Sequence, residues 1–329
     1  MDLSTYILSD TPLQINRMHM CTWDIKGCKA FVEFGFDFSV EASQKNEICL
    51  IVASSFISEA DTTEDLYEQI VSKENLAFIF NDQYKGKKEV NHGPLSVGCD
   101  ISFTIQKEMR FLPISKIETH NGYSKLIIKN WSTATSNYIR FCIDTNYDVL
   151  ATIQHDITRT LHIYDVRINS LRNLPKFIES FLDNGMELCR KISKCYMLHA
   201  VPSEYIICHH EEGFKSLRIV EHEKFYAYLS KKRELKADEN TIAFNKLQAQ
   251  DGEYSFCTEF EHERVGTQQL LVAIGCNLLC SIFFAIGSIL HPTQSGAPWY
   301  NNMPVLYWIA IVIIIGLIIY LVVCARKKK

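Results

Sequence analysis

Four residues of the types that bind zinc lie in the second half of the chain: Cys189, Cys195, His199 and Cys208. Zinc prefers thiolate and imidazole ligands, but its common sites pair cysteines two to four residues apart. Five residues separate the first two cysteines here, and the chain has no C-x-x-C. Burial of small thiols explains this pattern better than metal binding does. We therefore expect no bound metal and no other cofactor.

A second group of titratable residues surrounds two expected strands and could support acid–base chemistry. Carboxylates and imidazoles exchange protons near neutral pH when their surroundings shift their pKa values. The exposed positions of alternating strands also collect such residues without any catalytic role. The group is Asp144, Asp148, His155, Asp156, His162 and Asp165.

Sequence motifs of the common enzyme classes are absent. The chain has no G-x-S-x-G nucleophile turn, no G-x-x-x-x-G-K-[ST] phosphate loop and no G-x-G-x-x-G dinucleotide fingerprint. We therefore expect a protein that is not an enzyme and that has no catalytic residue.

The elements that would position these residues indicate an α+β domain over residues 1–264, with a possible subdivision near 150. Phe34, Phe36, Phe38 and Val40 alternate with smaller or polar residues, as in a half-buried strand. Apolar residues at helical spacing predict three helices, at Asp61–Val71, Pro175–Ile192 and Glu221–Lys232. Further strands are expected at Ile48–Phe56, Leu76–Phe80, Ile101–Ile105, Lys125–Lys129, Tyr138–Ile143, Leu161–Ile168 and Tyr205–Cys208.

Charge divides the chain sharply. The whole chain has 34 Lys and Arg against 38 Asp and Glu, but residues 1–264 contain all the acids and have a net charge of −8. Residues 265–325 contain no charged side chain, and the last four residues carry +4. An acidic domain of this kind disfavours a basic nucleic-acid-binding protein, so we expect no direct sequence-specific nucleic-acid binding.

The uncharged region predicts a transmembrane hairpin. Residues 265–290 and 305–325 are each long enough for a spanning helix, and 291–304 forms an external loop with three prolines. By the positive-inside rule, the basic tail Arg326, Lys327, Lys328 and Lys329 is cytoplasmic, and so is the N-terminal domain. The expected location is a bacterial inner membrane, with the lipid bilayer as a partner.

Small and polar residues follow one face of the first expected span, at Ala273, Asn277, Ser281 and Ala285, with Ser288 one turn further on. Such a stripe lets helices approach closely. It could pack against the second span of the same chain. It could also join copies of the chain in a homo-oligomer that lines a polar path.

This layout resembles the two-helix membrane effectors of bacterial anti-phage systems, most of all the transmembrane effector of some retrons. The resemblance rests on the domain of residues 1–264, the two spans and the tail Arg326 to Lys329. It implies a toxin-like effector in abortive infection, held inactive by a reverse transcriptase with its multicopy single-stranded DNA. The alternative is a membrane-anchored adaptor or sensor whose hairpin only tethers.

Overall fold

Strands dominate the computed structural model. The parts of the chain that it describes are residues 3–25, 30–40, 45–92, 95–106, 108–145, 149–156, 159–172, 174–211, 213–219, 228–229, 240–248, 253–263, 267–290, 312 and 316.

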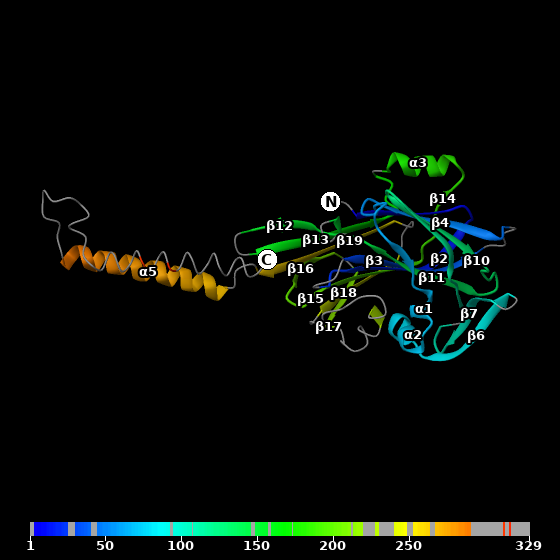
Figure 1. Ribbon diagram of the computed structural model, residues 1–329, viewed down its shortest axis with the longest axis horizontal. Helices are drawn as coiled ribbons and strands as arrows, with labels where there is room; N and C mark the ends of the chain where they lie inside the picture. The colour runs from blue at the N-terminus through cyan, green and yellow to red at the C-terminus, as the bar shows by residue number, and fades with distance from the viewer. Residues whose placement is uncertain are drawn as a thin grey trace. The chain divides into compact units, whose positions relative to one another are not determined.

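The chain divides into two units. The first, here called the β unit, comprises residues 1–155 and 160–262, and the second comprises 156–159 and 263–329. The β unit contains two mixed sheets, sheet A and sheet B, and Figure 1 shows their strands with the helices beside them.

Sheet A has the strand order β16–β19–β13–β1–β4–β10–β9, with β12 beside β13 and β14 beside β1. Strands β1 and β13 are parallel, whereas β1 and β4 are antiparallel. The bounds are β1 Leu3–Ser9, β4 Glu47–Ser54, β9 Ile114–His120, β10 Tyr123–Lys129, β12 Thr152–His155, β13 Arg159–Ile168, β14 Glu187–Leu188, β16 Ile206–His210 and β19 Tyr254–Glu263.

Sheet B has the order β17–β18–β15–β2–β3–β11–β8–β7–β6, with β5 beside β11. Strands β2 and β15 are parallel, and so are β8 and β11. The bounds are β2 Leu13–Trp23, β3 Phe31–Val40, β5 Thr63–Asp65, β6 Tyr84–His92, β7 Leu95–Phe103, β8 Met109–Phe111, β11 Ser136–Asp144, β15 Lys194–Pro202, β17 Phe214–Ile219 and β18 Asn240–Gln248.

The main apolar core lies between the two sheets. Phe34, Phe36 and Phe38 of β3 are fully buried there, and they meet Val166 of β13 and Phe256 of β19 in one cluster. Because successive side chains of a strand point to opposite faces, the residues between them in β3 face the other side of sheet B. Those residues are Glu33, Gly35 and Asp37, and they begin the polar network described below.

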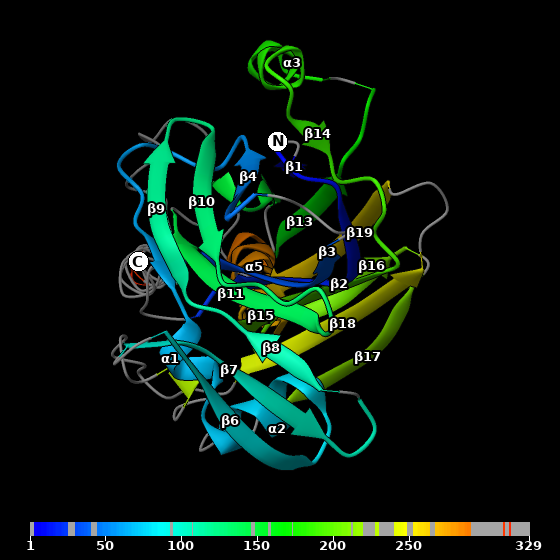
Figure 2. The same cartoon turned by 90° about the vertical axis from the view of Figure 1, so that its right-hand side faces the viewer.

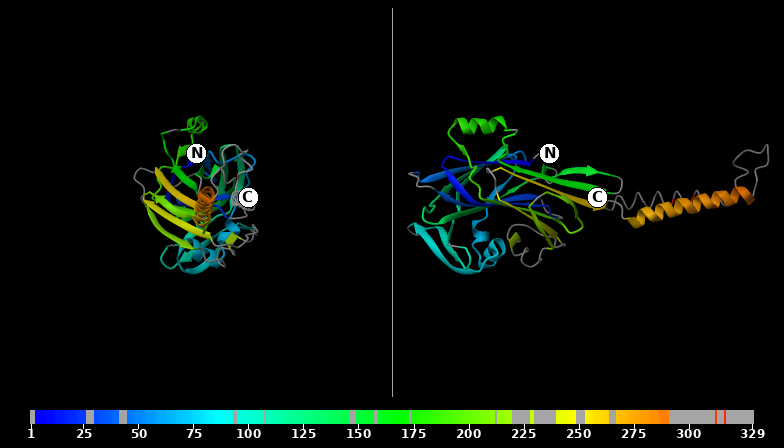
Figure 3. Two further views of the ribbon diagram at one scale, coloured as in Figure 1. Left: turned by 90° about the vertical axis from the view of Figure 1, so that its left-hand side faces the viewer. Right: turned by 180° about the vertical axis from the view of Figure 1, so that it is seen from behind.

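Helices cover part of the outer face of each sheet. Helices α1 (Tyr67–Ile70) and α2 (Lys73–Phe80) contribute Ile70, Leu76 and Phe80 to a second core on sheet B. Helix α3 (Lys176–Asp183) buries Ile178 against Tyr6 and Leu8 of sheet A. Figures 2 and 3 show α3 on one side of the β unit, and Figure 2 shows α1 and α2 on the opposite side.

The predicted α+β class is wrong, because the described residues are mainly β. Several local predictions are confirmed, among them the strands at 34–40, Ile48–Phe56, Lys125–Lys129, Tyr138–Ile143 and Leu161–Ile168. The strand predicted at Leu76–Phe80 is instead part of α2, whose first turn is capped by Ser72.

The three predicted helices agree with the structure to different extents. Asp61–Val71 contains β5 as well as α1, and the helix predicted at Pro175–Ile192 ends at Asp183. Gly185 follows that end with a left-handed φ of 84°, which stops the helix. The helix expected at Glu221–Lys232 lies outside the described residues, apart from 228 and 229.

The predicted transmembrane hairpin is also wrong. Helix α5 (Thr267–Leu290) occupies the first expected span, but no helix in the described residues has the length and apolar character needed to cross a bilayer. The prediction rested on the length of two uncharged, mostly apolar stretches, and these features alone do not make a helix a transmembrane span.

The location that depended on the hairpin, a bacterial inner membrane with the N-terminal domain and the tail on its cytoplasmic side, is wrong as well. The lipid bilayer as a partner stays a prediction. Within α5, the hydroxyl of Ser281 donates to the carbonyl oxygen of Asn277 at 2.9 Å. The expected loop, the second span except residues 312 and 316, and the tail Arg326 to Lys329 lie outside the described residues.

Candidate functional site

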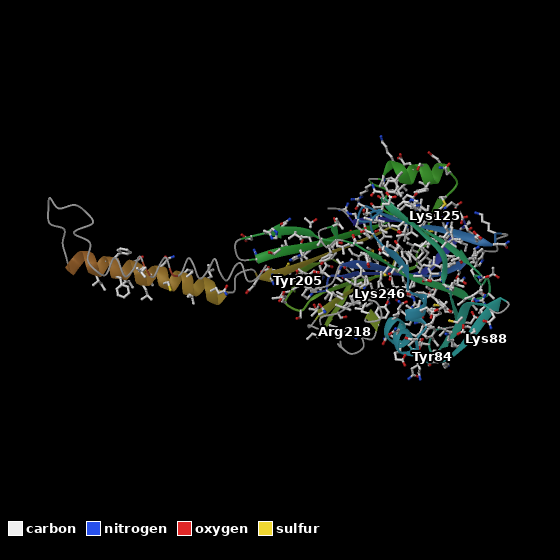
Figure 4. All side chains as sticks on the ribbon, in the orientation of Figure 1. Tyr84, Lys88, Lys125, Tyr205, Arg218 and Lys246 are labelled. Atoms are coloured by element: carbon white, nitrogen blue, oxygen red, sulfur yellow. The ribbon has the colours of Figure 1, made fainter. Side chains whose placement is uncertain are left out.

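Aromatic and basic side chains meet on the outer face of sheet B, on the strands β15, β18 and β17. We call this the aromatic–basic surface and define it by Lys194, Tyr196, Arg218, Phe244 and Lys246. Figure 4 labels Arg218 and Lys246, which lie on the β17–β18 side of the β unit, and Lys125, which lies away from them on β10.

Strand register places these residues on one face. Tyr196 of β15 is opposite Lys246 of β18, and Leu198 is opposite Phe244. Strand alternation sends the intervening residues of β15, Cys195 and Met197, into the core between the sheets. The outer face of β15 and β18 therefore contains Tyr196, Phe244 and Lys246, together with the apolar Leu198 and Ile242.

The two aromatic rings form a stacked pair. The ring centroids of Tyr196 and Phe244 are 5.8 Å apart with an interplanar angle of 15°. The ammonium nitrogen Nζ of Lys246 lies 5.6 Å from the centroid of the Tyr196 ring, within the range of a cation–π contact. Tyr196, Phe244 and Lys246 are all half-buried, so each side chain packs against neighbours and also reaches the surface.

The local charge of this surface is positive. Strands β15, β17 and β18, as described, contain Lys194, Lys215, Arg218 and Lys246 and no Asp or Glu. Lys194 and Arg218 are exposed. The charged residues of these described strands are therefore all basic, although residues 1–264 have a net charge of −8.

A buried polar network begins next to the aromatic pair. The ring of His19 on β2 lies 5.2 Å from the ring of Tyr196, and its Nδ1 lies 3.2 Å from the hydroxyl of Tyr138 on β11. Burial, with smaller effects from Arg140 and Arg17, holds the pKa of His19 well below its usual value. His19 is therefore neutral at physiological pH.

The network ends in a buried ion pair. Nη1 of Arg140 donates to the Tyr138 hydroxyl at 3.1 Å, and Nη2 donates to Oε2 of Glu33 at 2.6 Å. The hydroxyl of Tyr228 donates to the same carboxylate oxygen at 3.0 Å. Burial raises the pKa of Tyr228 well above its usual value, so this hydroxyl stays protonated and can donate.

A second pair supports the polar side of β3. Nη2 of Arg17 donates to Asp37 at 3.3 Å and to Gln106 at 2.6 Å. Asn16 also donates to Asp37, at 3.2 Å. The carboxylates of β3 thus have donors from neighbouring strands, as buried charges require.

The candidate zinc ligands do not converge. Cys195 and His199 lie four residues apart on β15, which separates their Cα atoms by about 13 Å. Cys189 is buried, and Cys208 is exposed on β16 with its Sγ 3.4 Å from the carbonyl oxygen of Glu259. The described part of the chain holds no group of three or more His, Cys, Asp or Glu arranged for a metal ion.

The protonation of these residues follows their burial. Burial raises the pKa of Cys189 to about 12, and it lowers the pKa of His199 to about 3. The Nδ1 of His199 instead pairs with the hydroxyl of Thr22 at 2.8 Å. Cys189 is therefore a protonated thiol and His199 a neutral imidazole within the core.

The candidate acid–base residues are engaged in separate local contacts. Asp165 pairs with Arg167 at 3.0 Å, and His155 lies 3.3 Å from the hydroxyl of Thr160. His162 stacks on Tyr205 at 4.5 Å, and burial lowers its pKa to about 4. Asp156 pairs with Arg159, Asp144 lies at the end of β11, and Asp148 is outside the described residues.

The residues of the aromatic–basic surface were not among those predicted from the sequence. A signal existed in 240–248, where Ile242, Phe244 and Lys246 alternate with Thr241, Ala243 and Asn245. Ile242 and Phe244 read as positions that face the core, yet in the fold Thr241, Ala243 and Asn245 are the buried set. No local sequence pattern could indicate that Glu33 pairs with Arg140, because 107 positions separate the two residues.

Comparison with known proteins adds little. No family model matches the chain, and no curated protein matches it. Among solved structures, the chain is similar to a mutant M1 zinc metallopeptidase from Deinococcus radiodurans bound to a Tyr-Ser-Ala substrate. The identity is 7% and the TM-score 0.27, over 75% of this chain and 42% of that one. A similarity this low supports no conclusion about the fold or the function of the protein.

Proposed function

We propose that the β unit binds single-stranded nucleic acid, without sequence specificity, through the aromatic–basic surface. In this proposal the protein is a sensor or adaptor, not an enzyme. The observation that carries it is the stacked pair of Tyr196 and Phe244 with Lys246 over the Tyr196 ring. Aromatic platforms beside cations are how proteins bind unpaired bases together with the phosphates that join them.

Single strands suit this surface better than a duplex. Bases within a duplex are stacked on one another, so they cannot stack on Tyr196 or Phe244 without being unpaired. The basic residues Lys194, Lys246 and Arg218 lie on three adjacent strands of one sheet. By register, the Cα atom of Lys246 lies about 8 Å from that of Lys194 and about 14 Å from that of Arg218. A short stretch of single-stranded backbone can follow such a row of charges.

The anti-phage role expected from the sequence is part of the same proposal, without a membrane step. The ligand would be single-stranded DNA of the kind that a retron makes, and a reverse transcriptase would arrive with it. The positive surface on an otherwise acidic protein supports this choice, because the local field decides where a phosphate backbone is attracted. The proposal involves no base-specific contact.

Fluorescence anisotropy with a labelled oligothymidine of about 15 nucleotides tests the proposal. Replacing Tyr196 or Phe244 with Ala should weaken binding about tenfold, because each lost stacking contact contributes about 1–3 kcal/mol. The matched control is Tyr123→Ala, which removes a half-buried tyrosine from sheet A. It should leave the affinity unchanged.

Salt dependence tests the electrostatic half of the proposal. For single strands, each phosphate contact contributes about 0.7 to the slope of log affinity against log salt. Lys246→Gln should therefore lower the slope by about 0.7, whereas Lys125→Gln on β10 should not change it. Absence of oligonucleotide binding by the wild-type protein at low salt would overturn the proposed function.

A further inference from the structure

The buried network beneath the aromatic–basic surface has one end in contact with a surface residue. His19 is the last member of the network, and its ring lies 5.2 Å from that of Tyr196 at an angle of 58°. His19 is only 7% exposed, whereas Tyr196 is half-buried. The position of the surface ring therefore depends on a neighbour that is itself held in the core.

Each member of the network is held by the next. Tyr138 is fully buried and contacts both His19 Nδ1, at 3.2 Å, and Arg140 Nη1, at 3.1 Å. Arg140 is fixed in turn by its ion pair with Glu33. Three adjacent strands, β2, β3 and β11, supply these residues, so the network is tied to the centre of sheet B.

The directions of the hydrogen bonds fix the state of His19. A guanidinium group has donors only, so Arg140 donates and the Tyr138 oxygen accepts. The hydroxyl hydrogen of Tyr138 is then available to Nδ1 of the neutral imidazole, whose own proton is on Nε2. This arrangement satisfies Tyr138, and it holds the His19 ring in one orientation.

We infer that His19 is a positioning residue that holds the Tyr196 ring in the orientation needed to stack on a base, and that Tyr138 and the Arg140–Glu33 pair anchor His19. The inference rests on the proposed function. A ring that is held in its binding orientation loses less conformational freedom on binding, so the affinity for bases is higher. The phosphate contacts of Lys194, Arg218 and Lys246 do not depend on His19.

The test compares two DNA probes of equal length, an oligothymidine and an abasic oligonucleotide with the same phosphates. The ratio of their affinities measures base stacking, and the salt slope measures phosphate contacts. The main variant is His19→Phe, which keeps a ring against Tyr196 but loses the bond to Tyr138. The matched control is His162→Phe, since His162 is a buried histidine stacked on Tyr205 in sheet A.

We expect His19→Phe to lower the preference for oligothymidine about three- to tenfold with an unchanged salt slope. His162→Phe should change neither quantity. His19→Ala is the second variant, and it should lower the preference at least as much. Thermal unfolding of each protein, measured beside the binding, identifies the temperature at which all of them are folded.

The outcomes separate the inference from the proposed function. A preference that survives in both folded His19 variants overturns the positioning role alone. Equal binding of the two probes by the wild-type protein overturns base stacking on this surface, and the positioning role with it. If His162→Phe lowers the preference for oligothymidine as much as His19→Phe does, the inference is also overturned. The loss would then follow from replacing any buried histidine.

Discussion

Glu33 and Arg140 carry opposite charges at a depth where water hydrates neither. Their side chains are 2% and 8% exposed, and 2.6 Å separates the paired atoms. Both charges gain partners beyond each other, since Tyr228 donates to Glu33 and Arg140 donates to Tyr138. Losing one charge would leave the other buried without its counter-ion.

Glu33→Gln should therefore lower the free energy of unfolding by about 3–5 kcal/mol, measured by urea denaturation. The control is the exposed pair of Lys129 and Glu47, whose side chains are 44% and 53% exposed. Lys129→Met should change the free energy by about 0–1 kcal/mol. Equal small losses in the two variants would show that the buried pair does not hold sheet B together.

Gly35 lies directly below the hydroxyl of Tyr138. A Cβ at this position would overlap that hydroxyl, so Gly35→Ala should displace Tyr138 and lower the free energy of unfolding by about 1–3 kcal/mol. Gly86→Ala is the control, because a Cβ there meets nothing within 4 Å. Thermal unfolding compares the two, and similar midpoints would contradict the tight fit around Tyr138.

Helix α3 is a short helix that is held against sheet A mainly by one side chain. Ile178 is fully buried against sheet A, whereas the neighbouring Phe177 is 39% exposed. Ile178→Ala should lower the free energy of unfolding by about 2–4 kcal/mol, and Phe177→Ala by less than half of that. Chemical denaturation measures both, and a larger loss in the Phe177 variant would mean that α3 packs through its other face.

The strands that could be predicted are those with a clean alternation. In β3 apolar residues alternate with smaller or polar ones, the period that predicts a strand, although Glu33 and Asp37 are buried as well. In β13 burial itself alternates, with Tyr164, Val166 and Ile168 in the buried set. In β2 the register shifts between Ile15 and Arg17, so the alternation changes phase within the strand. The period-2 alternation of apolar residues is therefore interrupted at the bulge.

Other elements were missed because tertiary context outweighs local preference. Leu76 to Phe80 reads as an apolar strand, but Ser72 caps a helix there and Leu76 packs under sheet B. Strand β18 buries Thr241 and Asn245 and leaves Phe244 half-exposed, the reverse of what hydrophobicity predicts. The aromatic–basic surface arises from that reversal, so the sequence analysis could not find it.

The whole molecule should show a pH-dependent stability that depends on Asp24. Burial raises the pKa of Asp24 from 3.8 to about 7. The folded state therefore binds this proton more tightly than the unfolded state, and the free energy of unfolding falls as pH rises from about 4 to about 7. His162 and His199, with pKa values lowered to about 4 and about 3, act in the opposite direction below about pH 6.5.

Asp24→Asn isolates the carboxyl group, because the histidine effects cancel between variant and wild type. The difference in the free energy of unfolding should grow with pH, to about 4 kcal/mol in favour of the variant above pH 7. Urea denaturation at several pH values measures it. A difference that is constant between about pH 4 and pH 8 would contradict the burial of this carboxyl.

The absence of charge in residues 265–325 was the strongest pattern in the sequence, and it led to the wrong conclusion. It detected α5 as a helix of 24 residues, but an uncharged helix is not by itself a transmembrane span. The net charge misled in a different way. A total of −8 over residues 1–264 concealed a surface on β15, β17 and β18 whose charged residues, in the described part, are all basic.

The proposed site for single-stranded nucleic acid is the outer face of β15, β17 and β18. Photo-crosslinking locates the bound strand, with an oligonucleotide that carries iodouridine and with mass spectrometry of the modified peptides. We predict crosslinks at Tyr196 of β15 and Phe244 of β18, and their loss in the variant that carries Tyr196→Ala and Phe244→Ala. Crosslinks that fall on sheet A, or that persist in this variant, would contradict the account.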